Sequence, residues 1–368
     1  MSPFLLLCLT PTLTLTAAAV PTGSLPKISA DIYNPTNITF YLYQPARLTP
    51  NPPILVSPHW CHGSALAVYN GSSYAKLAEQ YGFLVIFPDS PNTDDHCWDV
   101  SSRATLSHYP ATEPGDTLGI VNMVHWTIKQ YAADAGRVFV SGVSSGAMMT
   151  EVLLGAYPDV FAAGTAFAGV PFGCFASPEN DKTRRGYWND DCARGKITKS
   201  PAEWKAVVEG AYPGYRGWRP KLQIFHGTED DVLFYPNFEE SIKQWTAVLG
   251  LNGDASWTTV AKTDDTPFAN WTKYAYSAVG HGDETWFEAY SAKGVNHNIG
   301  NHEEIAVKFF ELDCVSGNGE GRECFRWGNG GPLGNSLKGT EEGACLEVAE
   351  FRLNSCFKMR NHVVDSRR

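Results

Sequence analysis

Short apolar runs alternate along the chain with segments whose apolar residues recur at helical spacing. Continuous runs such as Phe83–Phe87 and Arg137–Ser141 are typical of parallel strands that are buried on both faces. Leu118, Val121, Val124 and Ile128 lie three or four positions apart, which is typical of an amphipathic helix. The alternation predicts an α/β fold, with a mostly parallel sheet covered by helices on both faces.

The apolar pattern also gives the expected bounds of the elements. Strands are expected at residues 38–43, 54–57, 83–87, 137–141, 162–170, 222–225, 274–276 and 285–292. Helices are expected at residues 74–81, 118–131, 147–154, 238–249 and 303–312. Residues 171–219 form a long polar and aromatic insertion between two of the strands.

The two ends of the chain differ in composition from the segment between them. Residues 1–19 are expected to be a secretory signal peptide, with an apolar stretch from Phe4 to Leu15 and small residues at Ala17–Ala19 for cleavage. Residues 20–312 are expected to form one large domain. Residues 313–368 are expected to be a Gly-rich linker and a Cys-containing tail.

Charge and cysteine content limit which classes of partner and which cellular compartment are expected. The 29 basic and 39 acidic residues leave a net charge of −10, and the absence of long basic stretches argues against a nucleic-acid partner. No apolar run outside the signal is long enough to span a bilayer, so no membrane partner is expected. Removal of Cys8 with the signal would leave eight cysteines, an even number that suits disulfides in a secreted, extracellular protein. Asn-x-Ser/Thr glycosylation sites occur at Asn37, Asn70 and Asn270.

The residues Gly142–Gly146 (Gly-Val-Ser-Ser-Gly) carry the strongest chemical signal. A predicted strand precedes them and a predicted helix follows, which is the context of the nucleophile elbow of an α/β-hydrolase. At such a turn the central serine is exposed, and the flanking glycines allow neighbouring elements to approach closely. Ser144 is the central serine, so the nucleophilic role is assigned to Ser144 rather than to Ser145.

A serine nucleophile needs a base and an acid that orients the base. In this architecture both partners follow the serine in the chain, in the order acid then histidine. Asp230 lies in the loop after the strand at 222–225 and is the preferred acid, with Glu229 and Asp231 as rivals. These acidic residues could instead cap the helix that begins near Asn237.

Three late histidines compete for the role of base. His297 follows the strand at 285–292 and a Gly-Val turn, directly before the last predicted helix, and is therefore preferred. His281 lies between two strands, and His302 lies at the start of that last helix.

The tetrahedral intermediate needs two N–H donors for its oxyanion. One is expected from Ser145, the residue after the nucleophile, and the other from the loop His59–Gly63, where Cys61 is nominated. His59, Cys61 and His62 could instead suggest zinc, but no four-ligand set with zinc spacing is visible. No metal and no cofactor are expected.

These residues resemble those of a known family, the fungal secreted acetylxylan esterases and type-B feruloyl esterases of carbohydrate esterase family 1. This branch is shared with poly(hydroxybutyrate) depolymerase-like esterases. The matching stretches run in the same order over about residues 30 to 312, and the elbow stretch is the most diagnostic. They are residues 59–64, 81–88, 97–99, 137–150, 157–164, 212–215, 226–230 and 294–297.

The resemblance implies roles for individual residues. It makes Ser144 the nucleophile, Asp230 the acid and His297 the base, and it places Cys61 at the second oxyanion donor. It also implies two disulfides, Cys61–Cys97 and Cys174–Cys192. Residues 20–312 would then be an α/β-hydrolase catalytic domain.

The function expected from this resemblance is a secreted serine ester hydrolase that removes acetyl or feruloyl groups from plant cell-wall xylan. One alternative is a polyester depolymerase or general carboxylesterase with the same triad. A second alternative is a non-catalytic carbohydrate-binding protein on a hydrolase scaffold. The expected partner is esterified xylan, and the protein is expected to be a monomer.

Aromatic residues and the tail complete the expectations. Trp98, Tyr212 and Tyr215, with Trp188 and Trp218, could offer a surface on which sugars stack, or could pack inside the insertion. Many members of the family end in a small cellulose-binding module. The tail would be a degenerate module of this kind or disordered, and the pairing of its four cysteines is left open: Cys314, Cys324, Cys345 and Cys356.

Overall fold

The computed structural model describes residues 23–110, 115–178, 186–251, 258–278, 285–314 and 324–327. The expected signal peptide, the rival base His281 and the tail cysteines Cys345 and Cys356 lie outside the described residues. Within the described part of the chain, no helix is both long and apolar enough to cross a bilayer.

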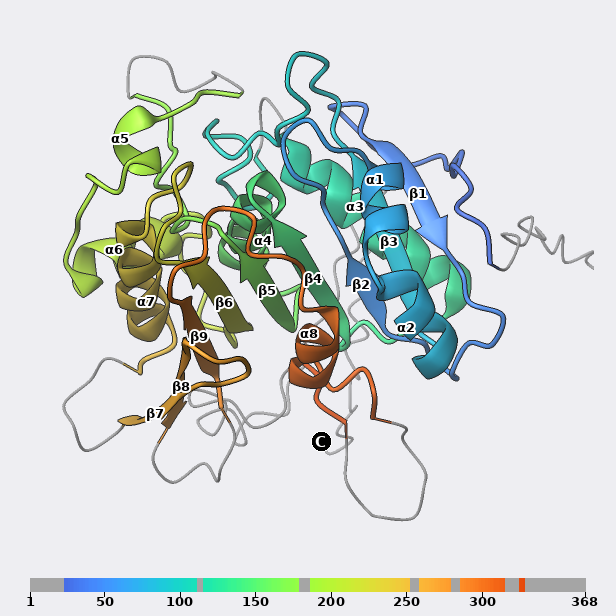
Figure 1. The fold of residues 1–368 in the computed structure, drawn as a ribbon. Helices are drawn as coiled ribbons and strands as arrows, with labels where there is room; N and C mark the ends of the chain where they lie inside the picture. Colours follow the sequence, from blue (N-terminus) through green and yellow to red (C-terminus); the bar gives the residue numbers. More distant parts are fainter. Residues whose placement is uncertain are drawn as a thin grey trace, which may run out of the picture. The chain divides into compact units, whose positions relative to one another are not determined.

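A single sheet forms the centre of the fold, and nine strands of the described residues belong to it (Figure 1). The spatial order is β1-β3-β2-β4-β5-β6-β9-β8-β7. The strands are β1 (Thr39–Tyr43), β2 (Ile54–Val56), β3 (Leu84–Asp89), β4 (Val138–Val143), β5 (Ala163–Phe167), β6 (Lys221–Gly227), β7 (Thr258–Asp264), β8 (Trp271–Ala278) and β9 (Phe287–Ala292).

The middle of the sheet is parallel, and its two edges are antiparallel. In this spatial order, the six neighbouring strands β3, β2, β4, β5, β6 and β9 pair in parallel. At one edge β1 pairs antiparallel with β3, and at the other edge β8 pairs antiparallel with β9 and with β7. Strands β2, β5 and β6 are buried at every position, as expected for strands covered on both faces. The expected mostly parallel α/β-hydrolase sheet is therefore confirmed. The edge strand β7 was not predicted.

Helices cover both faces of this sheet (Figure 1). One group contains α2 and α8, which contact each other, and the other contains α3, α4, α6 and α7, which contact one another in succession. The helices are α1 (Ala65–Gly71), α2 (Tyr74–Tyr81), α3 (Asp116–Tyr131), α4 (Ser145–Ala156), α5 (Asp190–Ala193), α6 (Pro201–Glu209), α7 (Pro236–Val248) and α8 (Glu303–Phe309). Every residue of α4 is buried, so this helix lies at the centre of its layer.

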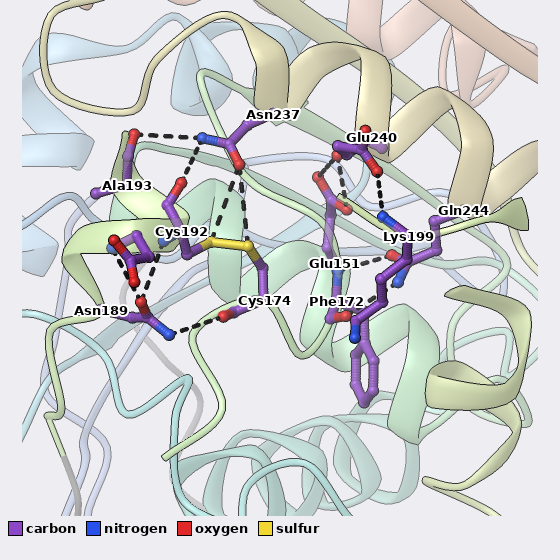
Figure 2. The surroundings of a disulfide bond; sticks show 12 residues. Glu151, Phe172, Cys174, Asn189, Cys192, Ala193, Lys199, Asn237, Glu240 and Gln244 are labelled. Atoms are coloured by element: carbon purple, nitrogen blue, oxygen red, sulfur yellow. Dashed lines mark hydrogen bonds between the residues drawn. A yellow bond between two sulfur atoms is a disulfide. The ribbon is translucent and has the colours of Figure 1, made fainter. Parts of the chain in front are cut away.

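The insertion at 171–219 folds against the start of α7, and a disulfide closes part of it. Cys174 and Cys192 are bonded, and the side-chain amide of Asn237 donates hydrogen bonds to the carbonyls of Cys192 (2.9 Å) and Ala193 (3.3 Å) (Figure 2). Asn189 accepts from two N–H groups at the start of α5 and donates to the carbonyl of Cys174. This disulfide is one of the two that the resemblance implied.

Two described residues beyond position 312 pack into or against the main hydrophobic core. Phe325 is 5% exposed and packs against the rings of Phe139, Trp218 and Trp286. The indole N–H of Trp327 donates to the carbonyl of Pro158 (2.9 Å). Phe325 and Trp327, which lie in the stretch assigned to the tail, therefore pack with the core.

A disulfide within the same stretch joins Cys314 to Cys324. It was one of the tail pairings that the sequence left open. The bond closes the chain between the last helix and the packed residues 324–327, so it holds Phe325 near its site in the core.

Candidate active site

Ser144 occupies a strained turn between β4 and α4. Its φ of 54° and ψ of −119° lie outside the regions that non-glycine residues ordinarily adopt. A Cβ on Gly142 would lie 2.4 Å from the backbone of Gly146, and a Cβ on Gly146 would lie 2.2 Å from the carbonyl oxygen of Pro58. Both glycines are needed for this close packing, which places the Ser144 hydroxyl at the carboxyl end of β4.

Three side chains from separate loops meet at this turn. The Ser144 hydroxyl donates to Nε2 of His297 at 2.9 Å. Nδ1 of His297 lies 2.8 Å and 3.0 Å from the two carboxylate oxygens of Asp230. A carboxylate only accepts, so Nδ1 carries the proton and Nε2 is free to accept from the serine.

The Asp230 carboxylate is buried and receives several donors. The N–H groups of Val232 (3.0 Å) and Leu233 (2.8 Å) donate to Oδ1, and Nε2 of His226 lies 3.2 Å from Oδ2. Burial by itself would raise the pKa of Asp230, but the hydrogen bonds from His226 and His297 hold that pKa below its usual range. The carboxylate is thus kept ionised beside His297.

His226 is a component that the sequence interpretation did not single out. It is the last residue but one of the buried strand β6, and its Nε2 also lies 2.7 Å from the carbonyl oxygen of Leu233. Because a carbonyl and a carboxylate can only accept, Nε2 of His226 must carry a proton. The sequence feature that could have indicated this role is the position of His226 four residues before Asp230, near the end of a predicted buried strand.

The loops that carry Asp230 and His297 are joined by backbone contacts. The N–H of Thr228 donates to Ala292 (2.9 Å), and the N–H of Glu229 donates to Val295 (2.9 Å). A Cβ on Gly227 would lie 2.2 Å from the carbonyl oxygen of Val295. Glycine at 227 therefore lets the two loops approach closely enough for Asp230 and His297 to meet.

The rival residues lie in other environments. Glu229 and Asp231 are exposed, and neither carboxylate bonds to His297. The Nε2 of His302 contacts the carbonyl of Ile299 (3.1 Å), and its ring packs among Phe167, Phe225, Phe268 and Trp271. Burial lowers the pKa of His302.

The two nominated oxyanion donors lie on segments that pack together. Ser145 is the first residue of α4, so its N–H has no carbonyl one turn earlier in the helix. The Cys61 N–H makes no hydrogen bond within the described residues. The loop that carries Cys61 reaches α4 through Pro58, whose carbonyl oxygen lies against Gly146. Both N–H groups are therefore available to a ligand.

Two side chains of the loop 59–63 are held by contacts within the protein. Cys61 is bonded to Cys97, which is the second pair that the resemblance implied. His59 is buried, with Nδ1 2.7 Å from the carbonyl oxygen of Trp60 and Nε2 accepting from the N–H of Ser90 (3.0 Å). Nε2 of His59 also lies 3.3 Å from a carboxylate oxygen of Asp89. Within the described residues, no group of three or more His, Cys, Asp or Glu side chains is placed to hold a metal ion.

Of the proposed sugar-stacking residues, Trp98 lies next to Ser145 but is buried, and Tyr212 lies far from Ser144. Trp98 is 1% exposed, and its indole N–H donates to the carbonyl of His59 (2.8 Å), so it has no free face. Tyr212 stacks between His108 and Tyr215. His108 contacts the carbonyl of Ala156 at the far end of α4, about 18 Å along the helix from Ser144.

The other two aromatic candidates lie in different environments. Trp218 is buried among Trp286, Phe325 and Trp327. Trp188 is 45% exposed and contacts Phe175 of the same insertion. Of the five aromatic residues considered from the sequence, Trp188 therefore has the most accessible ring.

A small hollow lies beside the elbow. Its cavity volume is about 10 Å³, which is close to the space needed for one water molecule. Gly142 and Val143, the two residues before Ser144, line it together with Pro58, Trp60 and Phe167.

The three glycosylation motifs lie at the surface. Asn37, Asn70 and Asn270 are all exposed. The structure therefore leaves each of these amides accessible to a modifying enzyme.

Comparisons with known proteins show which families and structures the chain is similar to. The family model for esterase PHB depolymerase matches residues 37–266. The chain is 46% identical over 291 residues to a probable acetylxylan esterase A of Aspergillus flavus, covering 78% of this chain and 88% of the relative. It is 45% identical over 288 residues to the acetylxylan esterase A of Emericella nidulans, covering 78% and 89%.

A solved structure shows the same likeness in three dimensions. The acetyl xylan esterase from Aspergillus awamori superimposes with a TM-score of 0.71 at 40% sequence identity. The match covers 79% of this chain and 100% of that structure. The fold described above is therefore shared over the whole of that enzyme.

Proposed function

The chain belongs to the esterase PHB depolymerase family, and on that premise we propose that it removes acetyl groups from xylan through an acyl-enzyme on Ser144. The observation that carries the proposal is the continuous hydrogen-bond chain from the Ser144 hydroxyl through His297 to Asp230. This arrangement activates a serine for attack on an ester carbonyl. It identifies the protein as a serine carboxylic ester hydrolase.

The geometry supports the following sequence of proton transfers. When Ser144 Oγ attacks the ester carbonyl, Nε2 of His297 takes its proton, and the Asp230 carboxylate stabilises the resulting imidazolium. The N–H groups of Cys61 and Ser145 bind the oxyanion. His297 then passes the proton to the departing sugar hydroxyl, which leaves an acetyl group on Ser144. Water then gives a proton to His297 and attacks the acetyl carbonyl. His297 returns this proton to Ser144 Oγ as the bond between Oγ and the acetyl group breaks, which releases acetic acid and regenerates the enzyme.

The curated relatives favour acetyl over larger acyl groups. The relatives named above are acetylxylan esterases. We therefore place acetylated xylan first among the substrates and feruloylated xylan second.

The test compares substrates and one matched pair of variants. We expect hydrolysis of 4-nitrophenyl acetate and release of acetate from acetylated xylan, with little activity on methyl ferulate or polyhydroxybutyrate. Ser144→Ala should lower kcat by about 10⁵–10⁶-fold and abolish labelling by a fluorophosphonate. Ser107→Ala removes a surface hydroxyl that bonds to Arg103 and should leave both readouts unchanged.

Each alternative gives a different result in this experiment. Faster turnover of polyhydroxybutyrate than of acetylxylan would indicate a polyester depolymerase. Binding to xylan without fluorophosphonate labelling of the wild-type protein would indicate a non-catalytic carbohydrate-binding protein. Equal labelling of Ser144→Ala and wild type would contradict the assignment of the nucleophile.

The proposed place of action is outside the cell. The three disulfides of the described residues suit an oxidising compartment, and residues 1–19 carry the pattern of a secretory signal. N-terminal sequencing of the protein from culture medium should begin at Val20 if cleavage follows Ala19. Treatment with a glycosidase should lower the apparent mass if Asn37, Asn70 or Asn270 is glycosylated.

A further inference from the structure

The hydroxyl of Ser145 has a partner that the proposed reaction does not use. The backbone N–H of Trp98 donates to Ser145 Oγ at 2.8 Å. Ser145 is 2% exposed, so water does not compete for this bond. The proposed mechanism needs only the backbone N–H of Ser145, which leaves the side chain free for another task.

Trp98 and its neighbour Cys97 also hold the second nominated donor. Cys97 is bonded to Cys61, and the indole N–H of Trp98 donates to the carbonyl of His59, two residues before Cys61. We call Cys97 and Trp98 the oxyanion bracket. The bracket contacts the segment that supplies one oxyanion N–H through a disulfide and an indole, and it contacts Ser145 through a backbone hydrogen bond.

The oxyanion bracket is itself fixed in place. The N–H of Cys97 donates to the carboxylate of Asp95 (2.8 Å), and the carbonyl of Cys97 accepts from the hydroxyl of Ser90 (3.0 Å). The N–H of Ser90 in turn donates to His59. These bonds close a loop of contacts, so a shift of the bracket would disturb several hydrogen bonds at once.

We propose that the Ser145 hydroxyl and the oxyanion bracket are positioning groups that set the separation of the two oxyanion N–H donors. This inference rests on the proposed function, because it assigns a role within the same site. The donors must lie about 2.7–3.1 Å from the place where the oxyanion forms. A bridge that contacts both donor segments keeps this geometry fixed before the substrate arrives.

A displaced oxyanion donor should change one kinetic constant and not the other. Formation and breakdown of the acyl-enzyme both pass through an oxyanion, so a misplaced donor slows both steps. Binding of the neutral ester does not depend on the donors to the same extent. A loss of positioning should therefore lower kcat and leave KM unchanged.

The first experiment removes only the hydroxyl. In Ser145→Ala the backbone N–H remains, and we expect kcat for 4-nitrophenyl acetate to fall about 10- to 100-fold with KM unchanged. An alkyl boronic acid, which forms a tetrahedral adduct with Ser144, should bind more weakly by a similar factor. The matched control is Thr127→Ala, which removes another fully buried hydroxyl, bonded within α3, and should leave kcat unchanged.

A second experiment tests whether the disulfide and the hydroxyl act together. The double variant Cys61→Ala/Cys97→Ala removes the covalent part of the oxyanion bracket and keeps both backbone N–H groups. Its combination with Ser145→Ala should lower kcat by less than the product of the two separate factors, because both changes release the same bridge. Near-ultraviolet circular dichroism checks that each variant is folded.

The outcomes separate this inference from the proposed function. A folded Ser145→Ala variant with wild-type kcat and wild-type boronate affinity would contradict the positioning role, even if its Tm falls. Strictly multiplicative losses in the combined variant would contradict a shared bridge. A wild-type protein without esterase activity would instead contradict the proposed function itself.

Discussion

Ser144 and His297 lie 153 positions apart in the sequence, yet Ser144 Oγ and His297 Nε2 are 2.9 Å apart. The parallel pairing of β4, β5, β6 and β9 closes this gap, because it brings the carboxyl ends of these strands to one edge of the sheet. The loops after β4, β6 and β9 then deliver Ser144, Asp230 and His297 to the same place.

The choice between the late histidines can be tested directly. We expect His297→Gln to lower kcat by at least about 10⁴-fold, because the serine loses its base. The matched control is His302→Gln, since His302 bonds to Ile299 rather than to Ser144. Steady-state kinetics with 4-nitrophenyl acetate measures both variants. A His302→Gln variant that loses more activity than His297→Gln would reverse the assignment.

The contact between His226 and Asp230 gives a second prediction. His226→Phe removes a hydrogen bond that lowers the pKa of Asp230, and we expect kcat to fall on the order of 10-fold through misplacement of the acid. His226→Gln keeps an N–H donor and should recover part of this loss. If both variants have the same kcat, the donor of His226 does not position Asp230.

The same contact affects stability in a defined pH range. A carboxyl group with a lowered pKa stabilises the folded state above its unfolded pKa, near 3.9, and this stabilisation is lost as the pH falls through the folded pKa. The Tm difference between wild type and His226→Phe should therefore be largest above about pH 4 and should shrink in stronger acid. Thermal denaturation from pH 3 to pH 7 measures it.

Glu151 is expected to change stability with pH in the opposite direction to Asp230. Burial raises the pKa of this carboxyl to about 8, although Trp245 and Ser241 donate hydrogen bonds to it. The unfolded chain has a pKa near 4.3, so between about pH 4 and pH 8 the folded state retains a proton that the unfolded state releases. The folded protein should therefore lose stability as the pH rises through this range.

The variant Glu151→Gln cannot titrate and isolates this effect. It should be more stable than wild type by about 1–4 kcal/mol at pH 8, and the advantage should vanish below about pH 4. Glu209→Gln changes an exposed carboxyl near Lys205 and is the matched control. Identical pH dependence of Tm in Glu151→Gln and wild type would show that Glu151 ionises in the folded protein.

The packing of the elbow gives a further prediction. In Gly146→Ala the new methyl group would lie 2.2 Å from the carbonyl oxygen of Pro58, so the loop that carries Cys61 must move. We expect kcat to fall about 100-fold and the protein to lose about 1–3 kcal/mol of stability. Gly71→Ala meets no atom within 4 Å and should retain wild-type kcat.

Local chemistry determined much of this site in advance. The strand, the Gly-x-Ser-x-Gly turn and the helix around Ser144 follow one another in the chain, so neighbouring residues alone indicate the elbow. Reasoning from the residues preferred Asp230 and His297 over their rivals by their positions after strands, and the family resemblance implied the same choice. The sequence thus predicted the parallel core and the order of the site, because burial on both faces and turn stereochemistry leave a pattern in neighbouring residues.

Contacts between distant segments were decided by the tertiary structure. Trp98 lies close to Ser145 but is buried by His59, and Tyr212 lies at the far end of α4. Phe325 follows a Gly-rich stretch and still packs into the core. An aromatic residue has the same pattern in the sequence whether it packs inward or faces a ligand. Only the packing of remote segments, which local periodicity does not encode, distinguishes the two.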